Sequence, residues 1–104
     1  MSGLTLDRAR LENLTLSVTA IMKTSLSNCI FLKVDSKFKN NYTKCNFENS
    51  QFDECNFRKS SFADCNFEHA QFVNSDMRET VFQSCKTSDV ENIDSLFRGS
   101  NLEI

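Results

Sequence analysis

The sequence has no proline, no tryptophan and only two glycines, Gly3 and Gly99, among its 104 residues. Sandwiches and barrels built from hairpins place Gly, Pro and Asn-Gly dipeptides at their turns, and two glycines are too few to serve such a fold. A collagen-like chain is excluded because it needs far more glycine. The turns of this protein must therefore be repetitive and free of glycine.

Long hydrophobic runs and an excess of charge of one sign are also missing. The longest uninterrupted apolar stretch, Cys29 to Leu32, is far shorter than the ~20 residues of a membrane-spanning helix. Residues 14–22 are mildly apolar but lack a convincing cleavage site, so we interpret them as folded structure. A net charge of −2 is typical neither of a disordered acidic tail nor of a basic nucleic-acid arm. We expect one small domain that contacts neither membranes nor, directly, nucleic acid.

The five cysteines are an odd number in a chain without a recognisable secretory signal. A disulfide framework is therefore not expected, and reduced thiols in the cytoplasm are the better interpretation. The spacing Cys-x-x-Cys does not occur and the single histidine is His69, which argues against a metal site. Since the sequence also has no Gly-x-Ser-x-Gly motif and no phosphate-binding loop, we expect a noncatalytic protein without a cofactor.

A period of five residues runs through the chain. Residues 40–104 divide into thirteen pentapeptides with a small first residue and a large apolar third residue. Residues 4–38 form seven more in a register one residue earlier, so the register shifts near residue 39. Of the twenty third places, seventeen hold Leu, Ile, Phe, Met or Tyr, and the exceptions are Ser36, Thr87 and Asn92. We assign residues 1–104 to a single repeat domain.

This period excludes both a helix and a flat sheet. A helix turns by ~100° per residue, so apolar residues five apart would spread around its whole surface. In a straight strand, residues five apart point to opposite faces, which would expose every second third-place residue. The first and third places can both point inward if each pentapeptide is one short extended side that ends in a corner. The pattern predicts a solenoid with one inward-facing column on each side.

The longer repeats indicate the number of sides. Cys45, Cys65 and Cys85 are spaced by twenty residues, and so are Arg58, Arg78 and Arg98. Four sides of five residues are thereby favoured over three, although an alternation of ten is also visible. About five such coils would form a rod roughly 24 Å long.

The triplets Cys-Asn-Phe, Ala-Arg-Leu and Ser-Asn-Leu, at residues 45–47, 9–11 and 100–102, carry a family resemblance. From residue 4 onward the chain resembles a pentapeptide repeat protein, whose loose pattern is a small residue, Asp or Asn, Leu or Phe, and two mostly polar residues. The resemblance implies an all-β fold, a right-handed quadrilateral parallel β-helix. It implies much less about activity, because fold does not settle function.

The third places predict the core. Four stacked columns of third-place residues are expected, with cysteines at first places packing as small hydrophobic residues. The predicted structural core contains Phe31, Phe47, Phe52, Phe57, Phe62, Phe67, Phe72, Met77, Phe82, Phe97, Cys45, Cys55, Cys65 and Cys85.

The tenth phenylalanine, Phe38, is the irregular site, beside the inserted residue. It either replaces Ser36 inside the coil or projects at a corner. The predicted weak points are the segment 36–42 and the last coil, which has Thr87 and Asn92 at third places.

One side of the expected solenoid carries most of the basic residues. Six basic residues face three acidic ones, Asp35, Asp76 and Glu79, which is a net charge of +3. Such polarity could steer a partner, and the alternative is an ordinary solvated surface of mixed charge. Aliphatic residues also share one side, in a strip formed by Ile30, Leu32, Val73 and Ile93. The candidate partner-binding surface consists of Lys37, Lys39, Arg58, Lys59, Arg78 and Arg98.

Three functions are compatible with this pattern. The first is a noncatalytic protein–protein interaction or scaffold module, free-standing or part of a longer protein. Its partner would be a protein of unknown identity. Homo-oligomers are also expected, through the ends of the solenoid, because the repeats run from Leu4 to Ile104 without a helix or polar cap. The second is a DNA mimic that acts on a type II topoisomerase, because residues 40–85 are similar to bacterial quinolone-resistance proteins. Those proteins are longer and more strongly anionic. The third is the targeting arm of a secreted bacterial effector.

Overall fold

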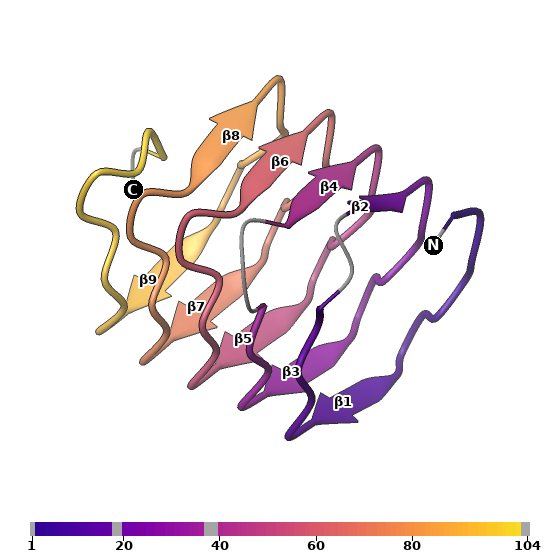
Figure 1. Cartoon of the computed structure of the whole chain (residues 1–104), viewed down its shortest axis with the longest axis horizontal. Helices are drawn as coiled ribbons and strands as arrows, with labels where there is room; N and C mark the ends of the chain where they lie inside the picture. The colour runs from indigo at the N-terminus through magenta and orange to yellow at the C-terminus, as the bar shows by residue number, and fades with distance from the viewer. Residues whose placement is uncertain (1, 18–19, 37–39, 103–104) are drawn as a thin grey trace.

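The chain folds into a four-sided coil of parallel β-strands (Figure 1). The computed structural model describes residues 2–17, 20–36 and 40–102. In these residues, five strands stack in one sheet and four in the other, all parallel. The first sheet contains β1 (Arg10–Glu12), β3 (Ile30–Leu32), β5 (Gln51–Asp53), β7 (Gln71–Val73) and β9 (Glu91–Ile93). The second contains β2 (Ala20–Met22), β4 (Asn41–Thr43), β6 (Ser61–Ala63) and β8 (Val81–Gln83).

The other two sides of the coil are held by single bridges instead of strands. One side stacks Thr5, Ser25, Asn46, Asn66 and Lys86, and the other stacks Thr15, Asp35, Asn56, Asp76 and Leu96. The step between stacked residues is twenty, and it becomes twenty-one only across the inserted residue, as between Phe31 and Phe52. The four-sided prediction is therefore confirmed, and a three-sided coil is excluded. Among the described residues no helix is long and apolar enough to cross a membrane.

The core is a set of stacked aromatic rings. Phe52 lies between Phe31 and Phe72, with ring centroids at 4.6 and 4.9 Å, and the three rings are nearly parallel. Phe62 lies in the same way between Tyr42 and Phe82, at 4.9 and 5.0 Å. Repetition of one residue type at one place makes this stacking possible, because parallel strands in register bring identical side chains together. The predicted core residues lie inside the coil, where Cys85 and Phe97 are partly buried and the others are buried.

The corners explain how the chain turns without glycine. Every described fifth place has a positive φ, from 47° at Asn74 to 79° at Gly99. Asn and Asp tolerate this left-handed conformation better than most residues, and they occupy many of these places. At second places, Asn side chains support the turn, since Asn46 Oδ1 accepts a hydrogen bond of 3.0 Å from the backbone N–H of Glu48. The repetitive turns expected from the sequence are confirmed, and they are free of glycine except at Gly3 and Gly99.

Ser36 keeps its third place inside the coil. Its side chain is 3% exposed and shares a 2.7 Å hydrogen bond with the hydroxyl of Tyr42. The Nδ2 of Asn40 donates to the Oγ of Ser36 at 2.8 Å, and the Oγ of Ser60 lies at 3.3 Å. Phe38, Lys37 and Lys39 lie outside the described residues. The polar residue at the register change is therefore part of a small buried network.

Candidate partner-binding surface

Three arginines form a column on one side of the solenoid. Arg58, Arg78 and Arg98 occupy fourth places, next to the bridged side that contains Asn56, Asp76 and Leu96. With Glu79 and Gly99 they line a shallow hollow of about 140 Å³. The twenty-residue step predicted from the sequence is what brings them together, one coil above the next.

Carboxylates interrupt this column. Arg78 holds Asp76 with two hydrogen bonds, Nε to Oδ1 at 2.9 Å and Nη2 to Oδ2 at 2.8 Å. The hydrogen bond from Arg78 keeps the pKa of the Asp76 carboxyl below its usual value. Two-point contacts of this kind between Arg and a carboxylate hold both groups in place. Arg78 is thus partly neutralised by a residue of its own coil.

Glu79 acts between coils. Its Oε2 lies 3.6 Å from Arg58 Nε and 4.0 Å from Lys59 Nζ, in the coil below. Among the residues that the structure describes, Arg98 takes part in no ion pair. The described part of this side has four basic residues against three acidic ones, a net charge of +1. The net charge of +3 predicted from the sequence also counts Lys37 and Lys39, which lie outside the described residues. Within the described residues, basic and acidic side chains alternate on this surface.

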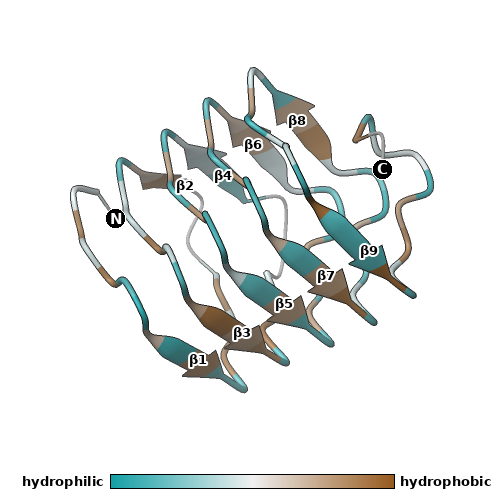
Figure 2. Ribbon diagram, turned by 180° about the vertical axis from the view of Figure 1, so that it is seen from behind, coloured by the Kyte–Doolittle hydropathy of each residue, from teal (hydrophilic) through white to brown (hydrophobic). Residues whose placement is uncertain are grey.

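The aliphatic strip is also interrupted. Leu32 and Val73 lie on either side of Asp53 in the register of β3, β5 and β7. Ile30 shares β3 with Leu32, the strand coloured brown in Figure 2, whereas Ile93 on the edge strand β9 pairs with Val73. Ile30 and Ile93 are exposed, at 38% and 43%, and Asp53 separates the two pairs. The four residues share a side, as expected, without forming a continuous apolar patch.

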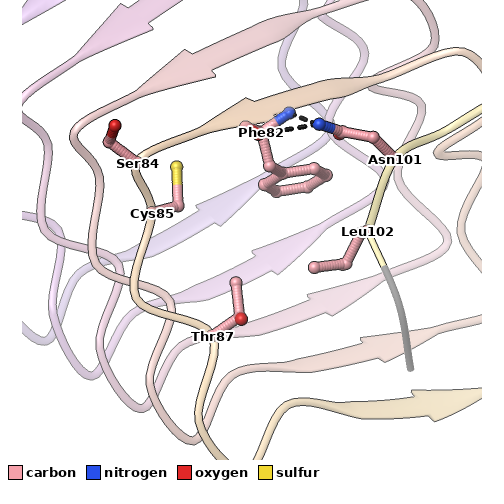
Figure 3. Close-up of a pocket in the computed structure, with 6 residues that line it drawn as sticks. All are labelled: Phe82, Ser84, Cys85, Thr87, Asn101 and Leu102. Carbon is pink, nitrogen blue, oxygen red and sulfur yellow. Dashed lines mark hydrogen bonds between the residues drawn. The ribbon is translucent and has the colours of Figure 1, made fainter.

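Cys85 lies among polar and apolar residues where the last described coils end (Figure 3). A hollow of about 380 Å³ is lined by Phe82, Ser84, Cys85, Thr87, Asn101 and Leu102. Asn101 Oδ1 accepts a 2.7 Å hydrogen bond from the backbone N–H of Phe82, and its Nδ2 donates to the Phe82 carbonyl at 2.9 Å. A side-chain amide thus takes the position of a further strand beside β8. The sequence predicts no polar cover at the ends of the solenoid, whereas Asn101 covers the backbone of Phe82.

The acidity of the thiols is set by burial and by stacking between coils, which places Cys65 beside Cys85. A hydrogen bond with Cys65 lowers the pKa of Cys85 to about 7, whereas burial raises the pKa of Cys55 to about 11. The Sγ of Cys85 also donates to the carbonyl of Phe62 at 3.3 Å. All five cysteines are free thiols.

The described residues offer no evident centre for metal binding. No group of three or more His, Cys, Asp or Glu among them is arranged to hold a metal ion. His69 lies at an exposed corner, with Nδ1 3.5 Å from Asp89 Oδ2. Every buried side-chain nitrogen or oxygen in the described part of the chain has a hydrogen-bond partner. The most organised chemistry on the outside of the coil is therefore the alternating charge around the arginine column.

Comparison with known proteins connects this geometry to a family and a fold. A family model described as "Pentapeptide repeat region" matches residues 36–103, more than half of the chain. No curated protein matches the chain. Among solved structures it is similar to a trypsin-treated variant of QnrB1, a plasmid-mediated fluoroquinolone resistance protein, with 18% identity and a TM-score of 0.62. That match covers 96% of this chain and 50% of the QnrB1 chain, so this chain spans half its length. The pentapeptide repeat protein Rfr23 from the cyanobacterium Cyanothece 51142 matches with 11% identity and a TM-score of 0.36, over 92% of this chain and 89% of that one.

Proposed function

The chain belongs to the pentapeptide repeat family, and from this premise we propose that it serves as a noncatalytic protein–protein interaction or scaffold module. Inside the coil, side chains are used for packing and hydrogen bonding, so binding chemistry is left to the outer places. The observation that carries the proposal is the ordered column of Arg58, Arg78 and Arg98. We further propose that it works in the cytoplasm, where free thiols stay reduced.

The column suits a protein surface that itself carries both signs of charge. Arg98, which pairs with no carboxylate of the described residues, suits a carboxylate of a partner, while Glu79 and Asp76 hold Arg58 and Arg78 in defined positions. Complementary charges at an interface contribute more to specificity and association rate than to affinity. Lys37 and Lys39, which the sequence assigns to the same basic side, are also part of the proposed partner-binding surface.

A differential pull-down tests this function. The tagged wild-type chain is compared with Arg58→Gln/Arg98→Gln and with a matched control, Glu48→Gln/Glu68→Gln, which removes two charges from fourth places of another side. We expect mass spectrometry to find proteins that the wild type and the control retain and that the arginine variant loses. Identical protein profiles for all three baits would contradict the proposal.

A second proposal is inhibition or protection of a type II topoisomerase. It is supported by the shared fold with QnrB1, which is named as a fluoroquinolone resistance protein. A DNA mimic has to reproduce an array of phosphates, and a net charge of −2 is small for this task. A DNA gyrase supercoiling assay with and without a fluoroquinolone decides it. If the chain neither inhibits supercoiling nor protects the enzyme from the drug, this second function is rejected.

A further inference from the structure

The outer face of the sheet β2-β4-β6-β8 carries no charged side chain. Its outward residues occupy second and fourth places, whereas a quarter of the residues in the chain, 25%, are charged. Met22 and Val81 are exposed at 43% and 48% and lie on the two outermost strands. We name this surface the even face, formed by Ala20, Met22, Asn41, Thr43, Ser61, Ala63, Val81 and Gln83. Depletion of charge is what distinguishes the centre of a protein interface from ordinary surface.

The even face has the regularity that sheet packing requires. Its four strands are parallel and in register, so second places align with second places and fourth with fourth. In Figure 1 the arrows of β4, β6 and β8 run in the same direction and step along the rod. The two middle strands present small side chains, Thr43, Ser61 and Ala63 among them. A second sheet can approach closely over such a surface.

The corner residues beside this face carry charges in an order that a second copy of the chain, turned end for end, can complement. The residues that directly follow the strands are Lys23, Lys44, Asp64 and Ser84, so the basic residues lie beside β2 and β4 and the acidic one beside β6. All four are exposed. A two-fold rotation about an axis along the strands reverses the order of strands in the second copy. Lys44 then lies opposite Asp64 of the second copy, and the same pair forms again by symmetry.

The same rotation decides which outward side chains of the two copies meet. Because β2 then faces β8, the exposed Val81 meets Ala20 of the second copy, and Met22 meets Gln83. In the middle, Asn41 faces Ser61 across the two sheets. Isologous contacts of this kind use one patch twice and close after two subunits.

The opposite sheet cannot use this arrangement. It has five strands, so the two-fold rotation places its central strand β5 opposite itself. Asp53 would then face Asp53 of the second copy, a contact between like charges. The even face therefore fits a second copy, and the five-stranded face does not. We propose that the chain forms a closed dimer through its even faces, with the two rods antiparallel.

The proposed dimer is weak. Four strands of three residues form a small surface, and the contact is expected to bury less than about 1,200 Å² in total, the range of transient complexes. Association should therefore depend on concentration in the micromolar range. This contact differs from head-to-tail stacking of solenoid ends, which is heterologous and continues into filaments.

Sedimentation velocity on the chain, from about 5 μM to about 500 μM, tests the dimer. We expect a monomer at the lowest concentration and a species that stops at two copies at the highest. Ser61→Glu places a charge at the centre of the even face and should weaken association about tenfold. Its matched control, Gln71→Glu, adds the same charge at a second place of the five-stranded face and should leave association unchanged. Circular dichroism confirms that both variants fold.

Charge reversal tests the antiparallel arrangement. Lys44→Asp and Asp64→Lys should each weaken the dimer, because each brings like charges together, and the double variant should restore it. A chain that stays monomeric at all concentrations would overturn the dimer, as would larger polymers or equal weakening by Ser61→Glu and Gln71→Glu. Failure of the double variant to recover association would overturn the two-fold geometry.

Discussion

The Oγ of Ser36 and the hydroxyl of Tyr42 share a hydrogen bond of 2.7 Å in an interior that is otherwise mostly aromatic. Both residues are at most 3% exposed. Ser36 replaces a large apolar residue at a third place, and Tyr42 is the only tyrosine of the chain. The polar residue at a third place is therefore satisfied by the one aromatic side chain that carries a hydroxyl group, next to the register change that the inserted residue causes.

The first prediction concerns the cost of breaking this pair. Ser36→Ala should destabilise the fold by about 2 kcal/mol, because it removes the short hydrogen bond of the buried Tyr42 hydroxyl and an acceptor of Asn40 Nδ2. Tyr42→Phe should cost about 1 kcal/mol, since Ser36 keeps Asn40 and Ser60 as partners. Urea unfolding measures both, with the exposed Ser88→Ala as control. In the double variant the loss should be smaller than the sum, and strict additivity would show that the hydrogen bond does not couple the two residues.

The second prediction concerns the corners. Ser84 lies at a fifth place with φ of 55°, a conformation that glycine adopts without strain. Ser84→Gly should therefore raise the free energy of unfolding by about 0.5–1 kcal/mol. Ser88→Gly is the matched control at a fourth place, where φ is not positive, and it should lower stability by a similar amount. Thermal unfolding distinguishes them, and a loss of stability in both variants would disprove the role assigned to the corner.

The third prediction concerns thiol reactivity. Only the thiolate is nucleophilic, and the pKa of Cys85 is lowered to about 7 by its hydrogen bond with Cys65. Alkylation of partly exposed Cys85 should rise as the pH increases through 7 and level off above about 8. Cys55, buried and with its pKa raised to about 11, should not react in the folded protein at pH 8. Mass spectrometry of peptides identifies the labelled residue. Cys65→Ala should move the Cys85 profile to higher pH, and an unchanged profile would reject the proposed cause.

The fourth prediction concerns the pH dependence of the Asp76–Arg78 pair. Because Arg78 lowers the pKa of Asp76 in the folded state, the pair contributes its full stabilisation above the unfolded value of about 3.9. This contribution is lost as the pH falls through the lowered, folded-state pKa. Asp76→Asn should cost about 0.5–1 kcal/mol at pH 7, since both side chains are partly solvent-exposed, and almost nothing near pH 2.

Asn keeps an acceptor for the backbone N–H of Arg78, so this variant removes the charge and spares the turn. The control Asp94→Asn changes an exposed corner residue and should have little effect at either pH. Chemical unfolding at both pH values provides the comparison. If the free energies of unfolding of wild type and Asp76→Asn differ by the same amount at both pH values, the Asp76–Arg78 pair is not the source of the pH dependence.

Local pattern determined most of this fold. A period of five excludes helices and flat sheets, and the twenty-residue spacing of Cys45, Cys65 and Cys85 indicates four sides. The columns read from third places are those of the structure, because the place of a residue in its pentapeptide decides whether it points inward. The sequence also showed that the turns need no glycine, although it did not show that every described corner lies at a fifth place with positive φ.

What only the tertiary structure decided depends on contacts between coils. Glu79 pairs with Arg58 and Lys59 of the coil below, and Asn101 bonds to the backbone of Phe82, nineteen residues earlier. Such partners follow from the exact stacking of side chains, which the five-residue pattern leaves open. Ser36 and Tyr42 illustrate the same limit. Their places in the repeat could be read from the sequence. Their hydrogen bond could not, because it depends on the sides of the coil that carry Ser36 and Tyr42 both staying in register across the inserted residue.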